Sequence, residues 1–205
     1  AINAWQQEMG AIHIEGRHAW GRWNFDLNSK MMKGKIMLPD DLNREAIEMD
    51  LEYIHMPVSD TAASEEVRFG SKGSVDTLED FDPKIIPNLD LKVAEIFLGT
   101  SNFGRWDMSI RQVEDITKIT VNDSNSKNLT MKGDINWSKN EKGHQTHLNL
   151  FRISTKNLGD TQRAFRKVPS IEAKNSKFDL ELTWQGSPAG FNYATLNGLV
   201  KVNIK

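Results

Sequence analysis

The chain has 205 residues and a mass of 23.3 kDa, enough for one large or two small domains. Its 38% hydrophobic and 26% charged residues are ordinary for a folded protein and argue against global disorder. A net charge of −2 leaves no basic excess to neutralise phosphates, so we expect no nucleic-acid binding. The absence of Cys excludes disulfides, a thiol nucleophile and Cys-ligated metals.

The first 56 residues carry three or four strand patterns, in which apolar residues occupy every second position. The clearest one places Ile47, Met49 and Leu51 on one face and acidic residues on the other. Earlier patterns cover residues 12–15, 23–28 and 32–38. Because a helix would need apolar residues three and four positions apart, residues 1–56 are predicted to form an N-terminal β lobe.

Residues 57–87 differ in composition, since Ser, Glu, Asp and Gly dominate and large apolar side chains are few. Such a segment is typical of a surface loop or linker. At roughly 30 residues it is longer than most connections, so we predict a mobile loop or a boundary between two lobes.

Strand patterns resume in a second β lobe, residues 88–205. Leu89, Leu91 and Val93 share a face, and the pattern then shifts by one position, which predicts a β-bulge near Ala94 and Glu95. Further strands follow, up to alternating patterns over residues 177–184 and 196–204.

One helix is predicted, at about residues 157–168. Asn157 or Thr155 can cap its N-terminus, Asp160 lies in its first turn, and Pro169 ends it. The expected fold class is therefore mainly β: a curved antiparallel sheet, forming a β-groove or closing into a sandwich or barrel, with one packed α-helix.

An area estimate shows why the apolar face of this sheet matters. One helix of about 12 residues covers about a fifth of the apolar face that nine strands would present. The sheet curling on itself, a second sheet, neighbouring protein or an apolar ligand must cover the rest.

The residues indicate no catalytic site, cofactor or metal. A nucleophile elbow around Ser187 would need Gly at positions 185 and 189, which are Gln and Ala. His144 and His147 are three residues apart, which puts them on opposite faces of a strand. We therefore expect a protein that is not an enzyme.

The Trp residues leave two interpretations open. Trp106, Trp137 and Trp184 are in phase with the apolar residues of their strands, which favours core or groove lining. Trp20 and Trp23 are not assigned by pattern. The alternative function is a structural or glycan-binding β module with a sealed core, which requires Trp rings that face outward.

Several motifs occur in a characteristic order along the chain. Near the C-terminus, Leu182-x-Trp184-x-Gly186-Ser187-Pro188 is followed by Phe191 and Gly198. Upstream motifs are Asp82-Pro83, Phe103-Gly104 with Trp106 and Met108, Gly133-x-x-x-Trp137 and Asn157-Leu158-Gly159. This arrangement resembles the AsmA-like C-terminal region of the YhdP family.

The resemblance implies a non-enzymatic segment of a periplasmic conduit for phospholipid transport between the inner and outer membranes. It implies that phospholipid acyl chains lie on an apolar concave β face, and that the full-length protein is anchored in the inner membrane. The candidates for that face are the inward apolar residues Met49, Leu51, Trp106, Met108, Met131, Ile135, Trp137, Leu180 and Leu182. Trp184, Gly186, Ser187, Pro188, Phe191 and Gly198 form a structural motif.

Two further expectations concern the ends of the chain. It begins at Ala1, without Met, in sequence that already resembles a strand, and no run of about 18 apolar residues occurs in it. We therefore expect a piece of a longer protein that contacts neighbouring segments of that protein. Exposed sheet edges would then let the isolated piece self-associate.

Overall fold

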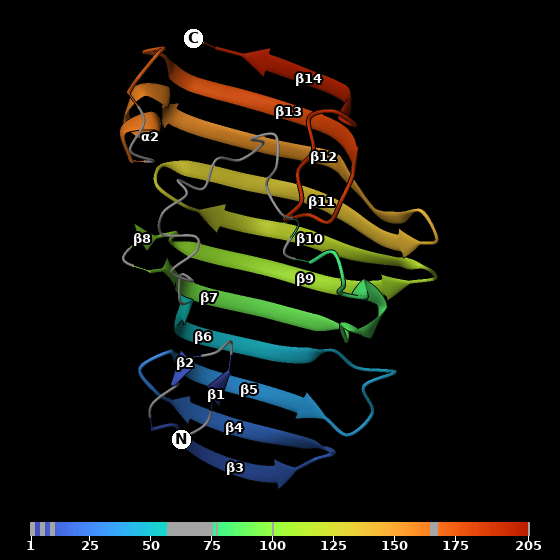
Figure 1. Cartoon of the computed structure of the whole chain (residues 1–205). Helices are drawn as coiled ribbons and strands as arrows, with labels where there is room; N and C mark the ends of the chain where they lie inside the picture. Colours follow the sequence, from blue (N-terminus) through green and yellow to red (C-terminus); the bar gives the residue numbers. More distant parts are fainter. Residues whose placement is uncertain are drawn as a thin grey trace.

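The computed structural model describes residues 3–4, 7–8, 11–56, 76, 78–99, 101–164 and 168–204. In this part of the chain, one sheet of twelve strands dominates (Figure 1). Two short strands, β1 (Asn3–Ala4) and β2 (Gln7–Glu8), pair only with each other.

Four strands form the N-terminal part of the large sheet as an antiparallel meander. They are β3 (His13–Ala19), β4 (Arg22–Asn28), β5 (Met32–Pro39) and β6 (Ile47–Met56). Trp20 and Gly21 connect β3 to β4 with φ angles of 58° and 75°. Two positive φ angles are typical of a tight hairpin turn whose twist matches that of the strands.

The next strand, β7 (Leu89–Leu98), pairs in parallel with β6 and continues the same sheet. Strands from both predicted lobes thus belong to one sheet, and the division into lobes at residues 1–56 and 88–205 stays a prediction. Most of the predicted linker, residues 57–75 and 77, lies outside the described residues. Its last part contains the short helix η1 (Pro83–Ile85).

The prediction of a β-bulge near Ala94 and Glu95 is wrong. The pairing of β7 with β6 keeps one register from Ile47↔Leu89 to Met56↔Leu98. The antiparallel neighbours of β7 keep one register too. Ile96 leaves the apolar face because the strand alternates without interruption, so the apolar pattern alone was misleading.

Seven more strands complete the large sheet. They are β8 (Ser101–Asn102), β9 (Arg105–Val113), β10 (Ile116–Asn125), β11 (Leu129–Asn140), β12 (Gly143–Asn157), β13 (Lys174–Gln185) and β14 (Asn197–Asn203). All of them pair antiparallel, and β8 pairs with β7 outside the main order.

The helix α2 (Leu158–Ala164) begins where it was predicted. The Asn157 side chain accepts a hydrogen bond from the Asp160 N–H (3.1 Å), which caps the first turn. The Thr161 hydroxyl lies 2.7 Å from that of Thr155 on β12, which fixes the helix to the sheet. Residues 165–167 of the predicted helix lie outside the described residues.

The large sheet does not close. Its edges are β3 and β14, which pair on one side only within the described residues and lie at opposite ends of the molecule (Figure 1). The predicted mainly β fold, with a mostly antiparallel sheet and one packed helix, is confirmed, and a closed barrel is excluded. No helix in the described ranges is long and apolar enough to cross a membrane.

Candidate functional site: the apolar face of the sheet

One face of the large sheet is apolar along its whole length, because the strand registers align the alternating patterns. Leu51 pairs with Val93, and Val93 pairs with Trp106. Ile110 pairs with Ile119, which pairs with Ile135. We call this side the apolar face and the opposite side the polar face.

The structure brings all nine predicted groove candidates onto the apolar face. Each is connected to the others by cross-strand pairs or by even spacing along one strand: Met49, Leu51, Trp106, Met108, Met131, Ile135, Trp137, Leu180 and Leu182. Leu51 and Trp137 are buried, and the other seven are partly exposed.

A bulge in β12 keeps the apolar pattern in phase. The register between β12 and β13 shifts between Leu148 and Phe151, so that both side chains lie on the apolar face. Leu150 absorbs the extra position with a φ of 49°, and its side chain is 80% exposed. On the neighbouring strand β11, Gly133 lies opposite the bulge. A Cβ atom at this position would lie only 2.5 Å from the Cα of Phe151. The bulge thus requires a glycine opposite it.

At one end of the strands, residues 78–87 cover part of the apolar face. Phe81 stacks on Trp137 with ring centroids 5.8 Å apart. Trp137 donates its indole N–H to Nδ1 of His144 (2.9 Å), and Nε2 of His144 lies 2.8 Å from the carbonyl oxygen of Glu79. Because the indole can only donate and the carbonyl can only accept, Nδ1 of His144 is the acceptor and Nε2 is the donor in this arrangement.

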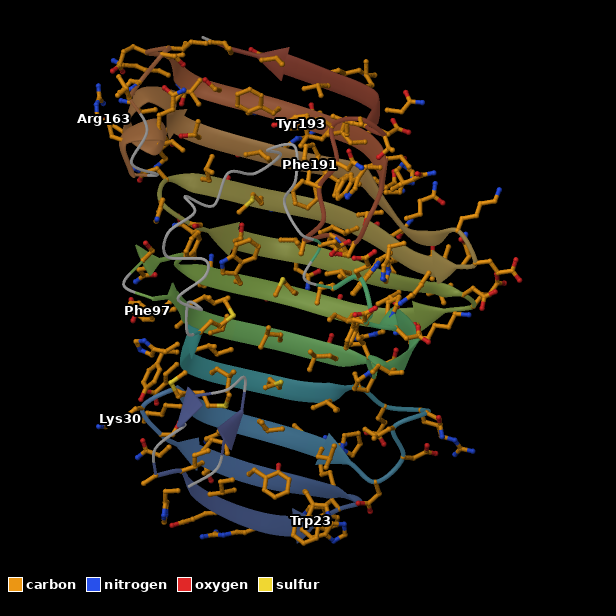
Figure 2. The ribbon with its side chains drawn as sticks, in the orientation of Figure 1. Trp23, Lys30, Phe97, Arg163, Phe191 and Tyr193 are labelled. Atoms are coloured by element: carbon orange, nitrogen blue, oxygen red, sulfur yellow. The ribbon has the colours of Figure 1, made fainter. Side chains whose placement is uncertain are left out.

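The predicted structural motif covers the neighbouring part of the same end. Trp184 is buried, donates its indole N–H to the Ser187 carbonyl (3.0 Å), and contacts the Phe191 ring edge-on at 5.2 Å. Gly186 has a φ of 133°, and its carbonyl accepts a hydrogen bond from the Thr146 hydroxyl. Figure 2 shows Phe191 and Tyr193 on the loop that folds back over the sheet between β13 and β14.

Asp76 anchors this loop from a distant part of the sequence. Its carboxylate accepts hydrogen bonds from the Ser187 N–H (2.7 Å) and hydroxyl (2.5 Å), and from the Leu78 N–H. Partial burial alone would raise the pKa of the Asp76 carboxyl, but these hydrogen bonds hold that pKa below its ordinary value. The fully buried Ser187 hydroxyl also accepts bonds from the Ala189 and Gly190 N–H groups.

Away from these contacts, the apolar face is incompletely covered. At the two edges of the sheet, Ile14 is 53% exposed and Val202 is 52% exposed. Trp23, on β4, stacks on Phe25 but remains 42% exposed (Figure 2). Apolar surface of this extent on a folded protein normally marks a binding surface.

The polar face carries charged side chains that pair across strands. Arg111 binds both oxygens of Asp90 at 2.7 and 2.8 Å, and Arg152 binds Asp179 at 2.5 Å. Burial alone would raise the pKa of the Asp134 carboxyl, but hydrogen bonds from Lys118 and Thr120 lower it. The sheet therefore has one face suited to hydrocarbon and one suited to water.

The described residues contain no group of three His, Asp or Glu side chains that could hold a metal. His144 and His147 lie on opposite faces of β12, as their spacing predicts. Sequence reasoning missed Asp76 and His144 as organising residues of the covered end. Asp76 bonds Ser187, which is 111 residues away, and His144 connects the nearby Trp137 to Glu79, which is 65 residues away, so neither role follows from a local motif.

Comparison with protein families matches residues 1–205 to the YhdP family, described as YhdP protein. Comparisons with curated proteins and with solved structures give no match. The family match covers every residue, including all motifs that carry the resemblance. The chain therefore belongs to the YhdP family.

Proposed function

We propose that this chain is a non-enzymatic segment of a periplasmic conduit that carries phospholipids between the inner and outer membranes. Membership of the YhdP family fits a lipid-transport protein of the cell envelope. The specific proposal is that phospholipid acyl chains lie along the apolar face while their headgroups remain in water. The full-length protein is proposed to be anchored in the inner membrane.

The observation that carries the proposal is the unbroken apolar face, which crosses eleven consecutive strands and ends at β3 and β14, two edges without a further partner strand in the described residues. Ten intervals of about 4.8 Å give a path of about 48 Å across the strands. One acyl chain spans half of a bilayer core about 30 Å thick, or about 15 Å. The face can therefore hold several chains in succession, and neighbouring segments of the same protein can extend it at β3 and β14.

The chemistry of the face suits chains of varying length and unsaturation. Met49, Met108 and Met131 are partly exposed on it, and a flexible thioether adapts to different contours. Each CH₂ group fully removed from water contributes about 0.8 kcal/mol, so ten half-covered groups contribute about 4 kcal/mol. Binding of this strength needs no specific headgroup contact and still permits movement along the face.

Photo-crosslinking at neighbouring positions on opposite faces tests the proposal. A photoreactive amino acid would replace Met108 or Leu182 on the apolar face, with Ser109 and Glu181 as matched controls on the polar face. In cells producing the full-length protein, the apolar-face positions should crosslink to phospholipid and the controls should not. Equal labelling of both faces, or no lipid at either, would refute acyl-chain binding here.

A further inference from the structure

A polar cavity of about 390 Å³ lies at the ends of β11, β12 and β13. These are the strand ends near α2, away from the loop that carries Phe191 (Figure 1). The lining contains no carboxylate, although acidic residues are the most numerous charged type in the chain. It consists of Asn125, Asn128, Thr130, Ser154, Thr155, Lys156, Asn175, Ser176 and Lys177.

The strand register places two rows of polar side chains in this lining, both on the polar face. In one row Thr130 pairs with Ser154, and Ser154 pairs with Lys177. The other row contains Lys156, with Asn128 and Asn175 at the corresponding positions of the flanking strands. Lys156 and Lys177 are therefore diagonal neighbours on adjacent strands. The Cα atoms of such neighbours lie about 7–8 Å apart, so one small anion can contact both ammonium groups.

The two lysines have no carboxylate partner in the described residues, unlike other cationic side chains on this face. Lys118 is paired with Asp134, and Arg152 with Asp179. Neither Lys156 nor Lys177 forms an ion pair with any carboxylate in the described residues, and their cross-strand neighbours are Asn and Ser. Two close cations without a counter-charge repel each other, so an anion between them is favoured.

Unused hydrogen-bonding groups surround the same cavity. The side-chain amides of Asn125, Asn128 and Asn175 form no hydrogen bond within the described part of the chain. The Ser176 hydroxyl does not belong to this set, because Ser176 pairs with Thr155 and lies with it on the opposite face, toward α2.

We propose that this cavity binds a phosphate group, with Lys156 and Lys177 as its cationic contacts and the Asn amides as neutral donors. The phosphate can belong to a phospholipid headgroup or be a free phosphate. The site lies at the rim of the sheet, on the side that remains in water. It goes beyond the proposed function, because phosphate binding here does not require acyl chains on the apolar face.

The test measures binding of inorganic phosphate and glycerol 3-phosphate to the full chain by NMR titration at low, constant ionic strength. The double variant Lys156→Gln/Lys177→Gln removes both cations. Lys92→Gln/Lys142→Gln removes the same charge elsewhere on exposed residues and serves as the matched control. A second variant, Asn175→Asp, adds a carboxylate of equal size next to Lys156, and Asp tolerates the φ of 50° at that position.

We expect Lys156→Gln/Lys177→Gln and Asn175→Asp each to weaken phosphate binding at least tenfold, and the control to change it less than twofold. No saturable binding to the unmodified chain, or equal loss in the control, overturns the proposal. A short-chain phosphatidylglycerol in a parallel titration distinguishes the sources. If it binds at least tenfold more tightly than glycerol 3-phosphate and loses that binding in the double variant, the headgroup is the ligand; otherwise free phosphate is.

A further variant, Leu180→Asn, separates this proposal from the conduit. It should weaken the phospholipid and leave inorganic phosphate unchanged. If it abolished phosphate binding while the chain stayed folded, the site would not be the cavity described here.

Discussion

Replacing Ser187 by Ala tests whether the contact with Asp76 holds the covered end of the sheet together. The Ser187 hydroxyl is fully buried, donates to the Asp76 carboxylate at 2.5 Å and accepts from two backbone N–H groups. A hydrogen bond to a charged group contributes about 1.5–3 kcal/mol, and the Ala189 N–H would also lose its acceptor, whereas the Gly190 N–H keeps the Ser187 carbonyl. We expect Ser187→Ala to lower the free energy of unfolding by about 2–4 kcal/mol.

The assay is urea unfolding followed by Trp fluorescence, with Asp76→Asn and the double variant completing a mutant cycle. A direct contact predicts a coupling free energy above about 1 kcal/mol at pH 7. The folded-state pKa of Asp76 is lowered, so its contribution is complete above the ordinary value of 3.8 and is lost as the pH falls through the folded-state pKa. The difference in the free energy of unfolding between the unmodified chain and Asp76→Asn should therefore become smaller below about pH 4. A loss under about 0.5 kcal/mol for Ser187→Ala, or a coupling that does not depend on pH, would refute the reasoning.

Three other predictions address separate features of the sheet. Gly198→Ala would place a Cβ 2.0 Å from the Glu181 carbonyl oxygen, so it should lower the melting temperature more than Gly143→Ala, where φ is also positive (100° against 136°) but the space is open; equal decreases would show that β14 adapts to the added Cβ. His144→Phe leaves the buried Trp137 indole N–H without its acceptor and should cost about 1–3 kcal/mol in urea unfolding, whereas His147→Phe on the polar face should cost less than about 0.5 kcal/mol. The isolated chain should associate in sedimentation experiments as its concentration rises, because β14 is an exposed edge, and Val200→Lys/Val202→Lys should weaken this association; a strictly monomeric chain at high concentration would disprove it.

The period of two in the sequence was sufficient to predict the apolar face. The alternation within each strand identifies the residues on its apolar side. Met108 on β9 and Leu182 on β13 could therefore be assigned to the apolar face without knowing which strands are neighbours. The register then brought these separate sets onto one side. The helix start was predictable for the same local reason, since Asn157 and Asp160 form a cap within four residues.

Features that depend on distant partners could not be predicted in this way. The expected bulge near Ala94 is absent because β6 and β9 hold β7 in register. One of the bulges that do occur, at Leu150, interrupts an apolar run whose pattern is compatible with a regular strand and with a bulged one. Asp76 appeared to be one more acidic residue in a polar segment. Its role depends on Ser187, whose position beside it is set by the whole intervening sheet.

Quenching by brominated phospholipids tests whether acyl chains occupy the apolar face. Trp106 lies on that face and is partly exposed, whereas Trp20 is 96% exposed in the turn between β3 and β4. Bromine quenches only rings that it contacts, so lipid with brominated chains should quench the unmodified chain. Trp106→Phe should remove part of that quenching, and Trp20→Phe should leave it unchanged. Quenching that disappears with Trp20→Phe, or a response to soluble glycans in place of lipid, would rule out acyl-chain binding on this face.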